Sequence, residues 1–292
     1  MKRAKRGKWI HGRLSVAILA FAACLSANPI ASAQASASPN ESHRTVELRL
    51  PPGTILPAKL EHGISSKKAR SGETIVLRLM QDVPLPDGGK IRESSRIRGK
   101  VVEATPAAKN SGGRLVMRFD ELDVRHERIT ISASLRAIAS LSEVQEAEIP
   151  VASIGFGTSY NWATTRQIGG DVRYGLDGPV TDSHNNEVGR GEYIGALAHV
   201  RANSEGGCRG AMEDDRLQAL WVFSSDACGV YGLDGTEIAH AGRDEPVGTI
   251  VLKMQRGDVN LRGGTGMLLR VIEVRPGTSQ LRVNQQLSPA PI

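Results

Sequence analysis

Cys208 and Cys228 have thiol side chains, which can take part in several kinds of chemistry. Such residues can form a disulfide, act as nucleophiles or ligate a metal. In an oxidising compartment, two cysteines are most simply explained by one disulfide. Closing a loop of about 20 residues would stabilise the fold by ~3 kcal/mol. We therefore predict that Cys208 and Cys228 are bonded to each other.

Catalysis is the alternative use of the same region. Residues 206–210 read Gly-Gly-Cys-Arg-Gly, the outline of a nucleophile elbow, and further groups with hydrolase chemistry follow: Ser224, Ser225, Asp226 and His240. An elbow needs a strand before its nucleophile and a helix after it, whereas polar residues flank Cys208 on both sides. An envelope hydrolase built around Cys208, Cys228 and His240 is thus the competing hypothesis, and a disulfide would remove its thiols.

One loop is rich in oxygen atoms of the kind that calcium prefers. Its members are Asp177, Asp182, His184, Asn185, Asn186 and Glu187. The loop lacks the glycine and the twelfth-position acid that an EF-hand requires. A polar, solvated loop is therefore favoured over a calcium site. The histidines of the expected folded part also lack metal-ligand spacing, so we predict no metal.

Trp162 and Tyr193 are the candidates for ligand contact, because large aromatic side chains supply binding anchors. They could line a groove for a glycan or a peptide. The sequence contains no dinucleotide fingerprint, P-loop, zinc-protease motif or serine-hydrolase elbow. We therefore predict no cofactor and favour a non-enzymatic protein.

The first 33 residues have the order of a secretory signal peptide. Six basic residues and no acid occupy positions 1–13, an apolar run covers residues 14–23, and a small-residue site ends at Ala33. We expect cleavage between Ala33 and Gln34, which gives an exported protein of the periplasm or cell envelope. In the alternative, residues 21–24 act as a weak lipobox and Cys24 is lipidated. Membrane attachment is expected only in that case.

The leader also explains the net charge. The chain has 37 Lys and Arg against 31 Asp and Glu, and the six basic residues of the leader account for the whole excess. Residues 34–292 are formally neutral. The charge therefore does not predict nucleic acid as a partner.

The elements that must position these residues are mostly strands. Alternating apolar and polar residues predict strands over 46–50, 74–80, 97–102, 115–119 and 129–135, with a hairpin over 114–131. Residues 55–64 fit an irregular or edge strand, and residues 86–89 (Pro-Asp-Gly-Gly) a turn. Spacing of three among Ile138, Leu141 and Val144 predicts a short helix over 137–147. Further strands are expected over 194–200, 218–223, 236–240, 248–253 and 267–274.

Several turn-and-strand motifs of the first half carry a resemblance to a known family. They are residues 53–60 (Gly-Thr-Ile-Leu-Pro-Ala-Lys-Leu), 64–69, 72–73, 81–83, 87–91, 99–102 and 114–119. Residues 53–135 thus resemble the C-terminal β-barrel region of the VirB10/TrbI family of secretion-channel proteins and related small exported barrel modules. That family has Ile-Pro-x-Gly where this chain has Ile-Arg-Glu-Ser at 91–94. The resemblance implies a barrel fold more than an activity.

Composition divides the chain into five expected regions. They are a signal peptide (1–33), a disordered lead-in (34–44), a β-barrel or sandwich module (45–148), a glycine- and aromatic-rich β unit with one disulfide (149–275) and a disordered tail (276–292). We predict an all-β, non-enzymatic structural or binding module of the envelope. Its expected partners are other envelope proteins or cell-wall components, with self-association as a further mode. A surface glycan- or peptide-binding protein is another alternative.

Overall fold

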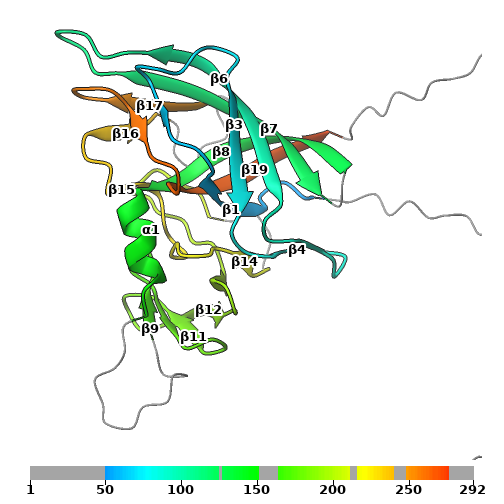
Figure 1. The fold of residues 1–292 in the computed structure, drawn as a ribbon. Helices are drawn as coiled ribbons and strands as arrows, with labels where there is room; N and C mark the ends of the chain where they lie inside the picture. Colours follow the sequence, from blue (N-terminus) through cyan, green and yellow to red (C-terminus); the bar gives the residue numbers. More distant parts are fainter. Residues whose placement is uncertain (1–49, 125–126, 151–163, 211–215, 240–247, 276–292) are drawn as a thin grey trace, which may run out of the picture. The chain divides into compact units, whose positions relative to one another are not determined.

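The computed structural model describes residues 50–275, except 125–126, 151–163, 211–215 and 240–247 (Figure 1). The predicted all-β class is confirmed: strands dominate, and the described ranges hold one helix. The described residues belong to one compact unit.

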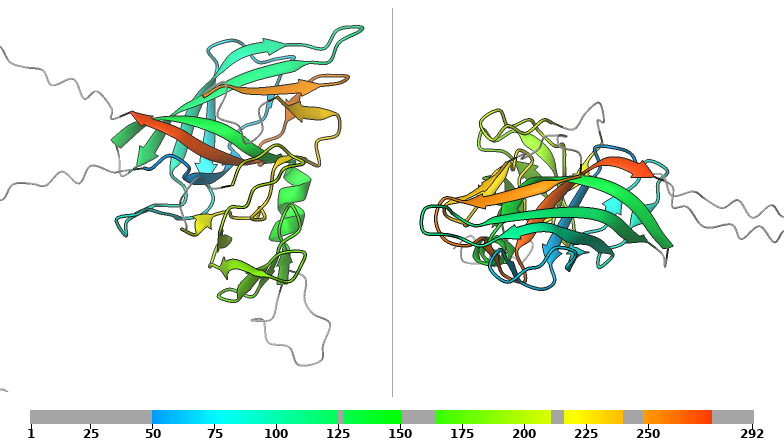
Figure 2. Two further views of the ribbon diagram at one scale, coloured as in Figure 1. Left: turned by 180° about the vertical axis from the view of Figure 1, so that it is seen from behind. Right: turned by 90° about the horizontal axis from the view of Figure 1, so that it is seen from above.

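Six of the described strands close into an antiparallel barrel (Figures 1 and 2). They are β1 (Ile55–Leu60), β3 (Thr74–Leu79), β6 (Arg96–Thr105), β7 (Arg114–Val124), β8 (Glu127–Ala139) and β19 (Gly266–Arg275). Each strand pairs with the next in chain order, and β19 pairs with both β8 and β1. Closure gives these strands partners on both sides. Of the two forms expected for the first module, the structure has the barrel.

Alternation decides which side chains fill the barrel. On β3, Ile75, Leu77 and Leu79 are buried, while Thr74 and Arg78 on the other face are not. Inward residues of the remaining strands, such as Leu56, Ile97 and Phe119, belong to the same hydrophobic cluster. Each fully buried side chain of this size contributes roughly 1.5–3 kcal/mol. The inside of the barrel is thus a packed core.

Strand β1 corrects the expectation of an edge strand over residues 55–64. It ends at Leu60 and is paired on both sides. Pro57 lacks an N–H, but its carbonyl accepts from Met80 N at 3.0 Å, just past the end of β3. The missing donor therefore falls where the β1–β3 ladder stops, which makes proline tolerable in an interior strand.

A β-bulge at Arg136 changes which side chains of β8 point into the barrel. Leu135 pairs with Leu269 and Ala137 pairs with Leu268, so Arg136 is the extra residue. Ala133 and Leu135 point into the barrel before the bulge, and Ile138 does so after it. Ala137 and Ala139 instead join a second hydrophobic cluster outside the barrel. An inserted residue shifts the two-residue alternation by one, as expected for a bulge.

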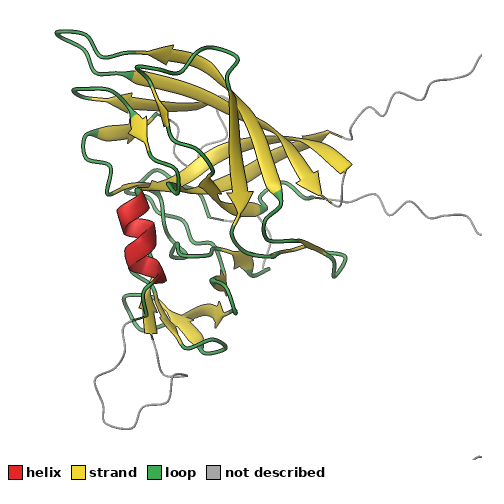
Figure 3. Cartoon of the chain, in the orientation of Figure 1, coloured by secondary structure: helices red, strands yellow, loops and turns green. Residues whose placement is uncertain are grey.

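Helix α1 (Leu141–Glu148) follows β8 directly (Figure 3). Its N-cap is Ser140, whose Oγ accepts from Glu143 N at 3.2 Å. The predicted helix over 137–147 is right in place but begins too early, because residues 137–139 complete β8 and only Ser140 supplies a cap. No helix within the described ranges is both long enough and apolar enough to cross a membrane.

A second sheet lies between β8 and β19 in the sequence. Its strands are β9 (Thr164–Arg166), β10 (Val172–Tyr174), β11 (Pro179–Thr181), β12 (Glu187–Gly191), β13 (Ala196–Ala198) and β14 (Gln218–Ala219), paired in that order. We call it the inserted sheet. Gly189 allows β12 and β13 to approach closely, since a Cβ there would lie 2.1 Å from the Leu197 carbonyl oxygen.

The remaining short strands extend or decorate the barrel. β15 (Gly229–Tyr231) runs parallel to β8, while β17 (Ile250–Met254) pairs with β7 and with β16 (Thr236–Ile238). β2 (Ile64–Ser65) pairs with β18 (Asn260–Leu261), and β4 (Val83–Pro84) pairs with β5 (Lys90–Ile91).

The boundary expected at residue 148 does not separate the strands. β17 and β19, both placed in the second unit by composition, lie in the barrel sheet. The second cluster in turn takes Ile55, Ala137 and Leu268 from barrel strands and packs them with Trp221 and Phe223 of the insertion. The barrel needs β19 to close, so its chain is completed only after the insertion.

The apolar stretch 217–223 is buried from residue 218 onward, as predicted, but it is not one long strand. Only Gln218–Ala219 are extended as β14. Trp221 adopts φ +50°, a left-handed conformation that ends the strand. Trp221 and Phe223 meet edge to face with ring centroids 6.4 Å apart in the second cluster. The stretch therefore fills that core from a turn.

Candidate binding cleft

A cavity of about 730 Å³ lies between the β3–β6 connection and the turn before β13. The β3–β6 connection contributes Gln81, Asp82, Pro84, Lys90, Arg92 and Glu93. The turn and β13 contribute Glu192, Tyr193, Ile194 and Leu197. We call this cavity the Tyr193 cleft. Its volume is that of a small-molecule or oligomer-unit site.

Gln81 ties the two walls of the cleft together. Its side chain is buried, donates from Nε2 to the Ala196 carbonyl at 3.0 Å and accepts at Oε1 from Trp221 N at 2.7 Å. A Cβ on Gly195 would lie 2.5 Å from Gln81 Oε1. Glycine at 195 is thus needed for this contact, which joins the barrel connection to the inserted sheet.

The β4–β5 hairpin forms one wall. Its turn has the expected chemistry: Gly88 has φ +79°, and Gly89 N donates to Asp87 Oδ1 at 2.9 Å. Asp82 accepts from Glu93 N at 2.7 Å, forms an ion pair with Lys90 and lies 3.5 Å from Arg92. Burial opposes ionisation of Asp82, but the bonds from Lys90 and Glu93 outweigh it and hold its pKa below the usual value.

Tyr193 stands at the tip of the opposite wall. Tyr193 is 82% exposed, more than any other large hydrophobic residue in the described part of the chain. Arg173 fixes the turn from below, donating from Nη1 to the carbonyls of Glu192 at 3.2 Å and Gly195 at 2.8 Å. A rigid backbone therefore presents a free aromatic ring beside carboxylates and cations. This arrangement suits a ligand with a flat or ring-shaped part and charged groups of both signs.

The structure places only one of the two predicted ligand-contact residues. Tyr193 lies at the cleft, whereas Trp162 lies outside the described residues. The other polar groups of the cleft, Asp82, Lys90, Arg92 and Glu192, were not singled out from the sequence. The Pro-Asp-Gly-Gly turn was the available signal for the hairpin, but its partner wall is over 100 residues away and leaves no local trace.

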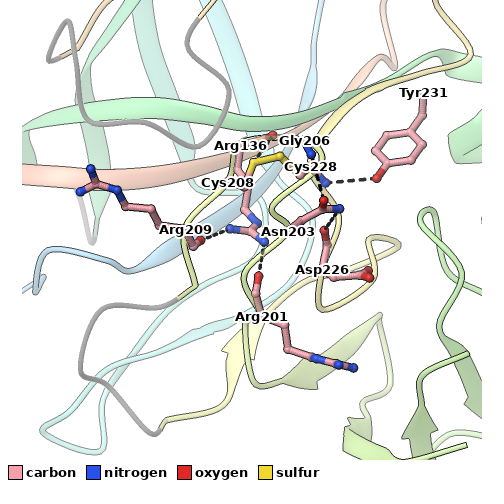
Figure 4. The surroundings of a disulfide bond; sticks show 9 residues. All are labelled: Arg136, Arg201, Asn203, Gly206, Cys208, Arg209, Asp226, Cys228 and Tyr231. Carbon is pink, nitrogen blue, oxygen red and sulfur yellow. Dashed lines mark hydrogen bonds between the residues drawn. A yellow bond between two sulfur atoms is a disulfide. The ribbon is translucent and has the colours of Figure 1, made fainter. Parts of the chain in front are cut away.

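The predicted disulfide is present between Cys208 and Cys228, with Cα atoms 5.9 Å apart (Figure 4). Asn203 braces the loop around it, accepting from Gly206 N at 2.9 Å and donating to the Asp226 carbonyl at 3.0 Å. Cys228 N donates to the Tyr231 hydroxyl at 3.1 Å. Both sulfurs are bonded, so neither is a thiolate nucleophile, and the cysteine form of the hydrolase hypothesis fails. His240 lies outside the described residues.

Arg136 explains how the disulfide loop is held on the barrel. The bulge turns its buried guanidinium outward, where Nη1 donates to the Arg209 carbonyl and Nη2 to the Arg201 carbonyl, both at 2.5 Å (Figure 4). Burial, together with the charge of Arg270, lowers the pKa of Arg136 to about 10, which leaves it protonated at neutral pH. The planar guanidinium can donate to the two carbonyls from two different nitrogens in a fixed geometry, whereas a lysine has one terminal nitrogen on a flexible stem.

The two serines of the competing hydrolase hypothesis help to shape a turn, Ser224 through its hydroxyl and Ser225 through its backbone N–H. Ser224 Oγ donates to Asp226 Oδ1 at 2.8 Å, and Ser225 N donates to Asp171 Oδ2 at 2.7 Å. Burial raises the pKa of Asp171. These bonds shape the turn that leads into Cys228.

The oxygen-rich loop is closed around Asp182. Its Oδ1 accepts from His184 N and Asn186 N, each at 2.9 Å, and its Oδ2 forms an ion pair with Arg201. N–H donors and a cation thus occupy the oxygens that calcium would need. No group of three metal-ligating side chains occurs in the part of the chain that the structure describes. Asp182 acts here as the acceptor of a turn.

A second cavity of about 420 Å³ lies at the start of α1, lined by Ser140, Ser142, Asp234, Thr236, Asn260 and Arg262 among others. It holds no exposed aromatic group comparable to Tyr193.

The chain matches no family model, no curated protein and no solved structure.

Proposed function

We propose that this protein is an exported, non-enzymatic module of the bacterial cell envelope that binds peptidoglycan through the Tyr193 cleft. The observation that carries the proposal is the exposed ring of Tyr193, held over a cavity of about 730 Å³ among groups of both charges. Peptidoglycan combines sugar rings, which stack on aromatic faces, with stem peptides that carry ammonium and carboxylate groups. Lys90 and Arg92 would meet its carboxylates, and Glu93 and Glu192 its ammonium groups.

Export is supported by the leader over residues 1–33 and by the Cys208–Cys228 disulfide, which persists in oxidising compartments. An envelope role is also supported by the resemblance of residues 53–135 to the VirB10/TrbI barrel region. Ser94, at the position of that family's glycine, has φ +66°. The turn can therefore form in this chain without glycine.

The test is binding of the exported protein to purified cell-wall sacculi by co-sedimentation, with calorimetry on soluble muropeptides. We expect Tyr193→Ala to weaken binding about tenfold, because a central aromatic anchor carries much of a site's affinity. Tyr174→Ala is the matched control, since Tyr174 is 41% exposed but lies on β10 and does not line the cleft.

Equal binding by the wild type and Tyr193→Ala would refute the role of the cleft. Loss of binding in both tyrosine variants would show that exposed aromatic groups act without a specific site. Absence of binding to sacculi, together with capture of an envelope protein that Tyr193→Ala fails to capture, would identify a protein ligand in place of the cell wall.

A further inference from the structure

Three cations lie directly opposite one another across neighbouring strands of the barrel. Lys59 on β1 pairs with Arg78 on β3, and Arg78 pairs with Arg96 on β6. Like charges at directly opposed positions destabilise a sheet. Such a row is therefore kept at a cost to folding.

Glu61 pairs with two of the three cations of the row and is less exposed than they are. Glu61 Oε1 is 2.9 Å from Arg78 Nη2 and 3.2 Å from Arg96 Nε. The Glu61 side chain is 15% exposed, whereas Arg78 and Arg96 are 44% and 49% exposed. The cations consequently face solvent and their counter-charge does not.

An acid between two cations, and a directly opposed pair of cations, also occur on β6, β7 and β8. Asp123 lies between Arg98, at 2.9 Å, and Arg128, at 3.7 Å. Lys100 and Arg118 form another directly opposed like-charge pair. Arg118 Nε lies 3.4 Å from Asp120 Oδ2.

The loop over residues 66–73 extends this surface beyond Lys100. Gly72 N donates to the Val101 carbonyl at 2.8 Å, and Ser71 Oγ donates to the Val102 carbonyl at 2.9 Å. Lys67, Lys68 and Arg70 in this loop are exposed, and so is the apolar side chain of Val102. The outward faces of β1, β3 and β6, which are neighbours on one side of the barrel, together with Glu61 and this loop, are called the cationic face.

The cationic face has an excess of positive charge, which acidic residues elsewhere in the protein balance. Its exposed or half-exposed positions hold eight basic residues (Lys59, Lys67, Lys68, Arg70, Arg78, Arg96, Arg98, Lys100) and three acidic ones (Glu61, Glu73, Glu103). That is an excess of five in a chain that is neutral beyond its leader. None of these residues lines either of the two cavities.

The geometry points to a planar anionic partner. The cations are spread over three adjacent strands about 4.8 Å apart and over the loop beside them, so they cover an area on one side of the barrel. A thread-like polyanion would be matched by cations arranged in a line, and a small ion by cations that line a pocket. We propose that the cationic face docks the protein onto the anionic headgroups of an envelope membrane leaflet, with Val102 at the interface. This contact needs neither lipidation of Cys24 nor the Tyr193 cleft.

The test is flotation of the exported protein with phosphatidylcholine vesicles that contain about 30 mol % phosphatidylglycerol, against vesicles of phosphatidylcholine alone. We expect binding to the anionic vesicles only, weakening as salt is raised. Each basic residue near the membrane surface raises the partition coefficient onto the vesicles about fivefold. Lys67→Gln/Lys68→Gln and Arg78→Gln/Arg96→Gln should therefore each lower the partition coefficient more than tenfold.

The control is Arg166→Gln/Arg190→Gln, which removes the same charge from exposed positions on the inserted sheet. It should change partitioning less than twofold. The Lys67/Lys68 variant alters only an exposed loop, so it keeps the test valid if loss of Arg78 and Arg96 unfolds the barrel. Tyr193→Ala should bind vesicles like the wild type, which separates this proposal from the function of the cleft.

Failure to float with anionic vesicles would overturn the proposal. An equal loss in the Arg166/Arg190 variant would also overturn it, because net charge and not the face would then control binding. Binding to soluble polyglutamate without flotation would assign the face to an acidic polymer and reject the membrane.

Discussion

Asp182 is a carboxylate whose surroundings favour its charged form. Hydrogen bonds from the backbone of Asn186, opposed by burial and supported by Arg201 and His184 N, hold the pKa of Asp182 well below its usual range. Because the folded pKa is lower than the unfolded pKa of about 3.9, the ionised group stabilises the fold above that value. The contribution is lost as pH falls through the folded pKa.

We predict that Asp182→Asn lowers the stability at neutral pH and that its deficit shrinks as the pH falls below about 4. Asparagine keeps an acceptor for the backbone donors but loses the ion pair with Arg201. Urea unfolding of both proteins from about pH 7 down to pH 2 measures the difference. Asp177→Asn, at an exposed position of the same region, is the control. A deficit that is constant over this range would contradict the argument.

At the scale of elements, the β5–β6 connection is a tight turn built with a strained residue. Ser94 has φ +66°, and its N–H donates to the Leu79 carbonyl at 2.8 Å. A left-handed conformation costs a non-glycine residue roughly 1–2 kcal/mol. The turn persists because it is bonded to the end of β3: Leu79 N also donates to the Ser95 carbonyl at 2.8 Å, next to the β3–β6 pairing.

We predict that Ser94→Gly stabilises the protein by about 0.5–1 kcal/mol, the relief of strain less the added entropy of glycine in the unfolded chain. Ser95→Gly is the matched control at the adjacent position, which lacks a positive φ, and it should be neutral or destabilising. Midpoints of urea unfolding compare the three proteins. Destabilisation by Ser94→Gly would mean that the serine side chain contributes more than the backbone strain costs.

At the scale of the whole molecule, the chain builds five barrel strands, leaves for the insertion and returns with β19 to close the ring. β19 pairs with β1 at its start, for example Leu56 with Leu269, and with β8 along its whole length. Leu268 faces the second cluster, while Met267 and Leu269 face the barrel core. One strand thus joins both cores.

We predict that a chain ending at residue 265 fails to fold cooperatively, because β1 and β8 would become open edges and both clusters would lose members. A chain ending at residue 275 keeps every described pairing and should unfold like the full-length protein. Circular dichroism and urea unfolding compare the two truncations. Cooperative unfolding of the shorter chain would show that the barrel does not depend on β19.

Local patterns were sufficient for the all-β class, for the β7–β8 hairpin over residues 114–131 and for the turn at residues 86–89. Alternation assigns faces within a strand, and Asp-Gly-Gly specifies a turn from its own backbone preferences. The Cys208–Cys228 bond was also inferable, because two cysteines leave one pairing. These features depend on residues close in sequence or on elimination.

Tertiary structure alone decided which strands meet. Alternation does not identify the partner of a strand, so it did not predict that β19 pairs with β1, some 200 residues earlier. Composition did not show that β17 and β19, beyond residue 148, belong to the barrel sheet. The Tyr193 cleft depends on Gln81 reaching Trp221 N, and the cationic face on the registers that set Lys59, Arg78 and Arg96 side by side. The sequence by itself determined the elements and their faces. Long-range pairing, which takes its free energy from cores shared across the whole chain, determined the sites.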